Sequence, residues 1–123
     1  MKFSKEHEWV ELKDDIAIVG ITDYAQSALG DLVSVELPKV GAQVQQFKAM
    51  AIVDSMKASS DVYAPISGEV VEVNTELNQH PELINSSAED KGWMVKIKPS
   101  NTKDLDALMG KEEYDKYTAG LKH

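Results

Sequence analysis

The sequence predicts a mainly β fold of short antiparallel strands, to which helices are additions and not core layers. Two observations support this fold class. Apolar residues recur in short segments, several of them alternating with polar residues, and Gly, Pro, Asp and Asn separate these segments. The stretches with helical spacing are brief, or they lie near the end of the chain.

The length of 123 residues and the mass of 13.6 kDa fit one domain, since domains cluster at about 100–150 residues. We expect a single domain over residues 1–123, with a core at about 8–98 and a helical tail at about 100–121. The chain has 0 cysteines, which excludes disulfides, thiolate zinc sites and cysteine nucleophiles.

The first elements are a hairpin and a helix. The alternation in Glu8–Leu12 and the apolar run Ile16–Gly20 predict two paired strands around an acidic turn. The segment Thr22–Gly30 predicts one short helix, with Asp23 as its N-cap and Gly30 as the residue that ends it.

Five further strands are predicted, at Leu32–Leu37, Met50–Val53, Val62–Ala64, Glu69–Val73 and Trp93–Lys98. The Met50–Val53 run is apolar without alternation, as expected of a strand buried on both faces. In the last strand, Trp93, Val95 and Ile97 are expected to share the inner face.

A faint internal repeat relates two of these strands. Val35–Gly41 lines up with Val62–Gly68, and both segments share a Val, a Pro and a Gly. If the repeat is real, two similar sheets face each other and the loop between them joins the sheets.

Helical segments are predicted late in the chain. The segment His80–Asn85 suits a helical turn with Pro81 at its first position. Gly110 should divide the tail into two helices, and Tyr114 and Tyr117 should share one side of the second because they are three residues apart.

The charge balance excludes several partners. Thirteen basic against 21 acidic residues give a formal charge of −8, and the basic residues are dispersed, so a nucleic-acid or anionic-membrane surface is not expected. No apolar run approaches ~20 residues, and the first residues lack the apolar core of a signal peptide. We expect an intracellular protein, in a bacterial cytoplasm or, if eukaryotic, in the mitochondrial matrix.

The sequence contains no recognisable set of catalytic residues. The sequence has no Gly-x-Ser-x-Gly and no phosphate-binding glycine loop, and its histidines, His7, His80 and His123, lack metal-ligand spacing. The adjacent carboxylates of Asp14-Asp15 and Glu112-Glu113 are expected to be solvated. We therefore expect neither catalytic residues nor a metal site.

Lys57 is the exception. It lies in the polar, small-residue stretch Ser55–Asp61, which predicts a hairpin loop with the lysine near its tip and nothing bulky to obstruct a modifying enzyme. Lys57 could be an ordinary solubilising lysine, a Schiff-base nucleophile or the attachment point of a carried group. A Schiff base needs a depressed pKa, whereas the flanking Asp54 and Asp61 favour the charged ammonium. The sequence fits the attachment point best.

Several blocks resemble one known family. Asp54–Ala58 and Ser60–Asn74 resemble the lipoyl-lysine region of glycine cleavage system H proteins. The family's other blocks are matched in order by His7-Glu8-Trp9, Gly20–Gln26, Leu29–Asp31, Val35–Pro38, Leu83–Ser87 and Gly92–Ile97. These matches span nearly the whole chain.

The resemblance implies a barrel-sandwich hybrid, as in other lipoyl and biotinyl domains, with additional helices, and lipoate joined by an amide to Lys57. It implies a non-catalytic carrier, which we expect to be a monomer and which receives an aminomethyl group from the pyridoxal-phosphate glycine decarboxylase. The aminomethyltransferase takes the group onto tetrahydrofolate, dihydrolipoyl dehydrogenase reoxidises the arm, and a lipoate ligase or octanoyltransferase attaches it.

The family also uses two acids to hold the loaded arm, and the matching positions are Glu8 and Asp61. The amine of an aminomethyl group is protonated near neutral pH, so carboxylates along a groove would attract it. In the competing interpretation, both acids are ordinary charged residues at the ends of strands and do not contact the arm.

The chain departs from the family at two places. Asp54-Ser55-Met56-Lys57 replaces the usual Glu-Ser-Val-Lys, and we expect this to alter recognition by the lipoylating enzyme. Ala88-Glu89 replaces Pro-Tyr, and we expect this to alter the conformation of the loop before Gly92. A biotin carrier stays open as an interpretation, although Ala58 stands where its motif normally has Met. A relay that donates lipoate to further carrier proteins and an unmodified paralogue stay open as well.

Overall fold

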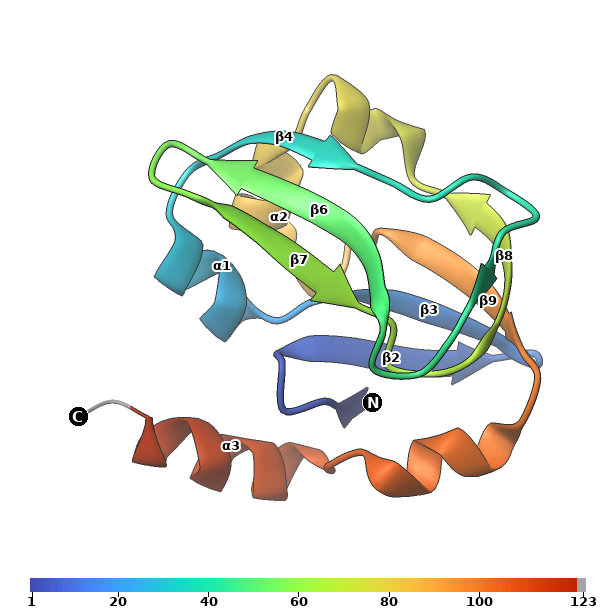
Figure 1. Ribbon diagram of the computed structural model, residues 1–123. Helices are drawn as coiled ribbons and strands as arrows, with labels where there is room; N and C mark the ends of the chain where they lie inside the picture. Colours follow the sequence, from blue (N-terminus) through green and yellow to red (C-terminus); the bar gives the residue numbers. More distant parts are fainter. Residues whose placement is uncertain (122–123) are drawn as a thin grey trace.

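Two antiparallel sheets form the centre of the structure, a computed structural model that describes residues 1–121 (Figure 1). The larger sheet has the order β1 (Lys2–Phe3), β2 (Glu8–Lys13), β3 (Ile16–Ile21), β9 (Val95–Pro99), β8 (Gly68–Val73) and β5 (Gln43–Val44). The smaller sheet has the order β4 (Leu32–Glu36), β6 (Ala49–Ser55) and β7 (Ser59–Tyr63). All of these pairings are antiparallel, so the predicted fold class is confirmed.

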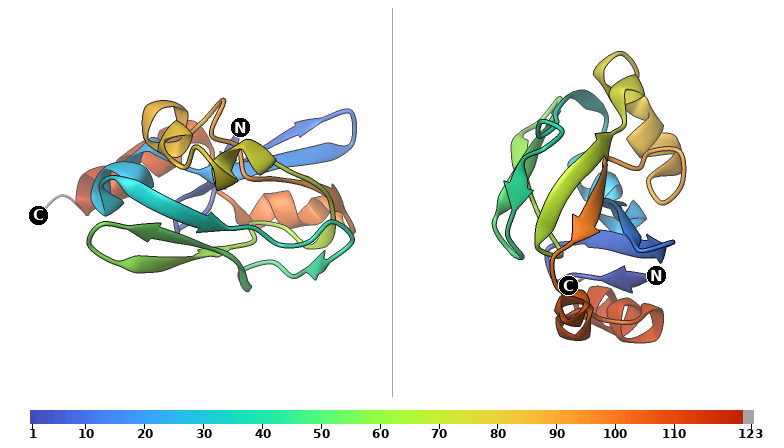
Figure 2. Two further views of the ribbon diagram at one scale, coloured as in Figure 1. Left: turned by 90° about the horizontal axis from the view of Figure 1, so that it is seen from above. Right: turned by 90° about the vertical axis from the view of Figure 1, so that its right-hand side faces the viewer.

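The helices are short and lie outside the sheets, as predicted. They are α1 (Asp23–Leu29), α2 (Glu82–Ser87) and α3 (Lys111–Gly120), with 3₁₀ turns η1 (Thr75–Asn78) and η2 (Thr102–Ala107). Gly110 separates η2 from α3, which confirms the predicted division of the tail, although its first part is a 3₁₀ helix. Figures 1 and 2 show this tail running beside β1, on the side away from the smaller sheet.

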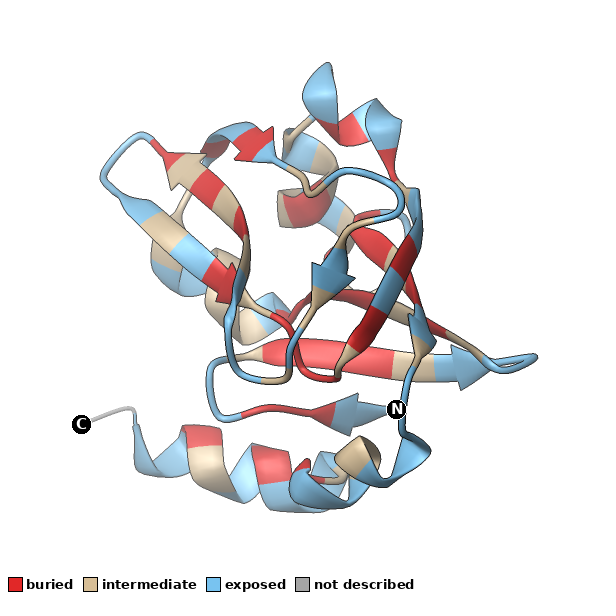
Figure 3. Cartoon of the chain, turned by 45° about the vertical axis from the view of Figure 1, so that its right-hand side comes forward, coloured by how far each residue is buried: buried red, intermediate tan, exposed pale blue. Residues whose placement is uncertain are grey.

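The core lies between the two sheets. Val53 and Val62 of the smaller sheet are buried, as are Val19, Val95 and Ile97 of the larger one. Figure 3 shows buried segments, in red, in both sheets. Each fully buried side chain of this kind contributes about 1.5–3 kcal/mol relative to exposure, so these positions hold the sheets face to face.

The first hairpin and α1 follow the sequence closely. Asp14 and Asp15 have φ of 50° and 67°, so they form the two-residue turn that matches the twist of paired strands. Gly30 ends α1 at φ 83°, as predicted. The N-cap is wrong by one residue: it is Thr22, whose hydroxyl accepts from the Ala25 N–H at 3.2 Å.

Three details of the predicted strands are wrong. β6 is longer than Met50–Val53 and is buried on one face only, because Ala51 and Val53 point inward whereas Ile52 faces outward, half-buried. β9 begins at Val95, so Trp93 does not share its inner face. Met94 is buried instead, and its N–H donates to the Val19 carbonyl at 2.8 Å.

An irregularity in β4 decides which of its apolar side chains are buried. The register with β6 shifts between Leu32 and Ser34. Leu32 and Val35 are therefore both buried, while the intervening Val33 is 52% exposed.

The internal repeat does not have the predicted arrangement. Val35 lies in β4 and Val62 in β7, which flank β6 in one sheet. The loop that carries Lys57 thus connects two strands of the same sheet and does not join two sheets. Gly41 and Gly68, which end the two segments, both have positive φ, at 93° and 159°.

A second apolar cluster attaches the tail to the β structure. The rings of Phe3 and Tyr114 stack at 4.6 Å, and the Tyr114 hydroxyl lies 2.7 Å from the Thr22 hydroxyl and 2.8 Å from His7 Nδ1. Burial raises the pKa of Tyr114 to about 12 and lowers the pKa of His7. Tyr117 also packs against this cluster, so both tyrosines share a side as predicted.

Candidate functional site

Lys57 is exposed at the tip of the β6–β7 hairpin, as predicted. Figure 1 shows the two strands of this hairpin side by side. The strands continue further than the sequence indicated, so the connection is only residues 56–58. The Ser55 hydroxyl shapes this turn, because it accepts from the N–H groups of Lys57 at 3.2 Å and Ala58 at 3.1 Å. Met56, beside the lysine, is 78% exposed.

Hydrogen bonds beside the turn join all three strands of the smaller sheet. The Asp54 carboxylate on β6 accepts hydrogen bonds from Ser34 of β4 and Ser59 of β7. These hydrogen bonds lower the pKa of Asp54. The aspartate that replaces the family's glutamate therefore has a structural role in holding the hairpin.

The hairpin tip rests on the junction between α1 and β4. The Met56 N–H donates to the Asp31 carbonyl at 3.1 Å. The Lys57 stem lies over Gly30, where an added Cβ would be 3.3 Å from Lys57 Cε and 3.7 Å from Nζ. No carboxylate in residues 1–121 forms a salt bridge with Lys57.

Glu8 lies in the interior, at 1% exposure. One carboxylate oxygen accepts from the Ser4 hydroxyl and the other from the Tyr63 N–H at 3.1 Å, so Glu8 links β2 to the end of β7. Burial raises the pKa of Glu8 to about 7, although both hydrogen bonds oppose the rise.

Asp61 is exposed on β7, two residues before Tyr63. It lines a shallow hollow on the outer face of the smaller sheet with Glu36 and Ile52, and Glu8 is not part of that lining. Both acids therefore lie near Tyr63, but Glu8 is buried beneath its backbone and Asp61 is exposed two residues earlier on β7.

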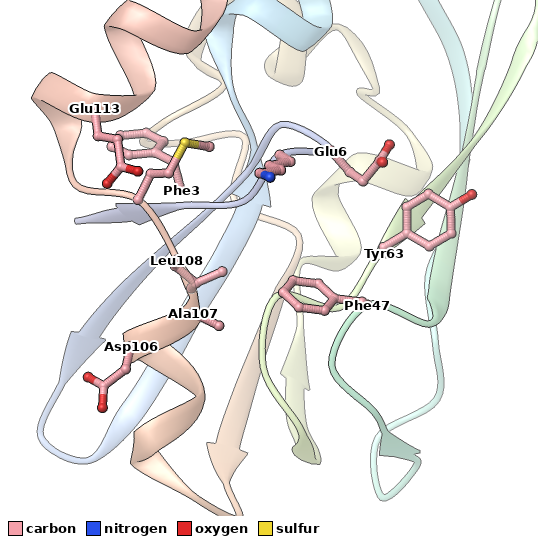
Figure 4. A pocket seen from close by; sticks show the side chains of 10 residues that line it. Phe3, Glu6, Phe47, Tyr63, Asp106, Ala107, Leu108 and Glu113 are labelled. Carbon is pink, nitrogen blue, oxygen red and sulfur yellow. The ribbon is translucent and has the colours of Figure 1, made fainter.

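A larger cavity of about 540 Å³ opens between β7 and the tail. Figure 4 shows Phe47 and Tyr63 on one side and Leu108 on the other, with Glu6 at the rim. Phe47 is half-exposed and has φ of 66°, a conformation uncommon for a side chain of its size. Because the Tyr63 N–H binds Glu8, the buried carboxylate lies directly behind one wall of this cavity.

Residues 1–121 contain no cluster of acids and histidines able to hold a metal ion, and His123 lies outside them. In the same part of the chain, no helix has the length and apolar character needed to cross a membrane.

Comparison with known proteins decides the family. The family model for glycine cleavage H-protein matches residues 1–120. This chain belongs to the glycine cleavage H-protein family. Relatives named glycine cleavage system H protein come from Carboxydothermus hydrogenoformans, 48% identical over 94% of this chain and 89% of the relative, and Geobacillus kaustophilus, 50% identical over 94% and 91%.

A mitochondrial H protein and an H protein of known structure are also similar to this chain. The mitochondrial H protein of Mesembryanthemum crystallinum is 54% identical over 95% of the chain and 71% of the relative. The crystal structure of the H protein of Mycobacterium marinum has a TM-score of 0.88 at 35% identity, covering 96% of this chain and 95% of that one. The barrel-sandwich hybrid is thereby confirmed.

The second departure from the usual H-protein sequence, Ala88-Glu89, also has a defined place. The Ala88 carbonyl accepts from Trp9 Nε1 at 2.9 Å, and Glu89 accepts from the Asp23 N–H at the start of α1 at 2.9 Å. Glu89 therefore places a carboxylate at a helix N-terminus, which is a favourable position for negative charge.

Sequence interpretation missed the residue that shapes the lysine turn. The sequence pattern presents Ser55 only as a small neighbour of Lys57, whereas its hydroxyl holds two backbone N–H groups of the turn. Its position two residues before the lysine is the signal that could have found it, because serine side chains often bind N–H groups just ahead of them.

Proposed function

We propose that this chain carries a lipoyl group, joined by an amide to Lys57, in the glycine cleavage system. Membership of the H-protein family gives it the function of the system's lipoyl carrier. The single observation that supports the attachment site is the exposed position of Lys57 at the tip of a hairpin whose turn and adjoining strand ends are fixed by hydrogen bonds.

The surroundings of Lys57 fit a lipoyl group. Nothing bulky covers the amine, and the stem is supported by a glycine, so a modifying enzyme can reach it. When bound, lipoate supplies a dithiolane that is reduced and reoxidised. A chain without cysteines has no thiolate of its own that would capture such an arm as a mixed disulfide.

The proposed partners follow from the family's role. They are glycine decarboxylase, the tetrahydrofolate-dependent aminomethyltransferase, dihydrolipoyl dehydrogenase, and the lipoate ligase or octanoyltransferase that attaches the arm. The chain itself supplies no catalytic residue in this proposal. It works in the bacterial cytoplasm or, in a eukaryote, in the mitochondrial matrix.

The test is the intact mass of the protein after incubation with lipoate, ATP and a lipoate ligase. We expect one lipoyl increment, absent from Lys57→Arg, and no increment from biotin and a biotin ligase. A biotin increment would show a biotin carrier instead. If the protein passed its lipoyl group to other carrier domains but did not support glycine cleavage, this would favour a relay. If its mass did not increase at all, this would favour an unmodified paralogue.

Glu8 and Asp61 are proposed to hold the loaded arm. The protonated amine of an aminomethyl group would be attracted by Asp61 from the surface and by the ionised form of Glu8 from behind the Tyr63 backbone. The arm would have to approach Glu8 through the cavity beside Tyr63, since Glu8 has almost no exposed surface.

Replacing both acids, Glu8→Gln with Asp61→Asn, is expected to speed loss of the aminomethyl group from the loaded protein about tenfold, the equivalent of about 1.4 kcal/mol. Release of ammonia and formaldehyde from purified loaded protein measures the rate. Glu69→Gln, which neutralises an exposed acid on β8, is the control. A double variant that loses the group no faster than this control would remove both acids from the proposal.

A further inference from the structure

Asn85 of α2 uses its whole side-chain amide to bind the α1–β4 junction. Its Nδ2 donates to the Gly30 carbonyl at 2.9 Å and to Gln26 Oε1 at 3.0 Å. Its Oδ1 accepts from the Leu32 N–H at 2.9 Å. One amide therefore fixes the end of α1 and the start of β4 relative to each other.

This junction is also the surface that contacts the β6–β7 hairpin, which carries Lys57 and is called the lysine hairpin below. Asp31, between the two residues whose backbones Asn85 binds, accepts the Met56 N–H, and Gly30 supports the Lys57 stem. The turn makes its other backbone hydrogen bonds with its own residues, through Ser55. The contact with the junction thus orients the turn relative to the rest of the protein.

We infer that Asn85 is a positioning residue for Lys57: by holding Gly30 and Leu32, it keeps the junction in the conformation that presents the lysine to the enzyme that modifies it. This inference rests on the proposed lipoylation of Lys57. No part of it requires Asn85 to touch the arm or the enzyme, because the effect passes through the junction and the Met56 hydrogen bond.

The physical consequence is a change in population. Without the Asn85 bonds, the junction and the turn sample other conformations, and only a fraction of the molecules presents Lys57 correctly. The apparent affinity of a partner falls in proportion to that fraction, while the rate at saturation is unchanged. A loss of positioning should therefore raise the KM for the carrier in lipoylation and leave kcat the same.

Asn74 offers a matched control. Its Nδ2 donates to the carbonyls of Lys91 at 3.1 Å and Trp93 at 2.9 Å, so it too links two segments through one buried amide. These hydrogen bonds join Asn74 to the segment before β9 and not to the lysine hairpin. Asn74→Leu therefore removes a comparable amide without disturbing the junction.

The experiment compares Asn85→Leu and Asn74→Leu with the unaltered chain by amide hydrogen exchange and by steady-state lipoylation with a lipoate ligase. In Asn85→Leu we expect exchange of the Met56 N–H to become about tenfold faster, and the KM for the carrier to rise about fivefold, with kcat within about twofold. Asn74→Leu should lower Tm without either effect.

Asn85→Asp provides a second variant if the leucine protein does not fold. It keeps the acceptor for Leu32 but loses the donors to Gly30 and Gln26. We therefore again expect a raised KM for the carrier and an unchanged kcat. An Asn85 variant whose Met56 exchange and KM match those of Asn74→Leu would overturn the inference. A wild-type chain that accepts no lipoyl group would overturn the proposed function instead, and Met56 exchange would then decide the role of Asn85 alone.

Discussion

Lys57→Arg is expected to reduce glycine–bicarbonate exchange, measured with glycine decarboxylase and the lipoate-ligase-treated carrier, to the rate seen without any carrier. Arginine keeps the positive charge and much of the length of the side chain, but its guanidinium does not accept the lipoyl amide. The loss is therefore attributed to the missing arm and not to an altered surface.

Lys48→Arg is the matched control for this result. Lys48 is also exposed and precedes β6, the strand that leads to the hairpin, so its replacement makes the same chemical change away from the tip. It should support exchange at the wild-type rate. Exchange by the Lys57 variant above the carrier-free rate would place the transferred group elsewhere.

The stability of the protein is expected to fall as pH rises through the range in which Glu8 ionises. The pKa of Glu8 is about 7 in the folded protein against an ordinary value of 4.5, so the folded state binds the proton more tightly than the unfolded state. Its contribution is fully present at low pH and is lost between these two values. The difference corresponds to about 3 kcal/mol, of which about 2 kcal/mol is lost between pH 5 and pH 7.5.

Urea unfolding of the wild type and Glu8→Gln at these two pH values measures the effect. The glutamine variant does not titrate, so it should lose about 2 kcal/mol less stability than the wild type over this range. Glu69→Gln removes an exposed carboxylate and should behave as the wild type. Parallel pH profiles for wild type and Glu8→Gln would show that the buried carboxyl does not titrate in this range.

Local sequence signals predicted much of the fold. The acidic turn at Asp14-Asp15, the helix end at Gly30 and the break at Gly110 were each found from backbone preferences that act within a few residues. The N-cap of α1 was misplaced by one residue, at Asp23 instead of Thr22, and the errors in the strands came from tertiary pairing. The irregularity in β4 and the one-sided burial of β6 depend on which strands lie beside them, and periodicity within one segment does not contain that information.

The candidate site was predicted in part. Lys57 was found from its polar, small neighbours and from the family resemblance, and both sources depend on contiguous residues. The burial of Glu8 was not predicted, because its partner, the Tyr63 N–H, lies 55 residues away in the sequence. Asn85 was recognised only as part of a motif, since the bonds that give it a role join α2 to two distant segments.

The most direct test of the central claim is the mass of the Lys57 peptide from the lipoylated protein, before and after incubation with glycine and glycine decarboxylase. We predict that this peptide alone carries the lipoyl group, and that after incubation it also carries one aminomethyl group and one added hydrogen. A lipoyl group on another peptide, or a lipoylated Lys57 peptide whose mass does not change with glycine, would contradict the proposal that Lys57 bears the arm that carries the aminomethyl group.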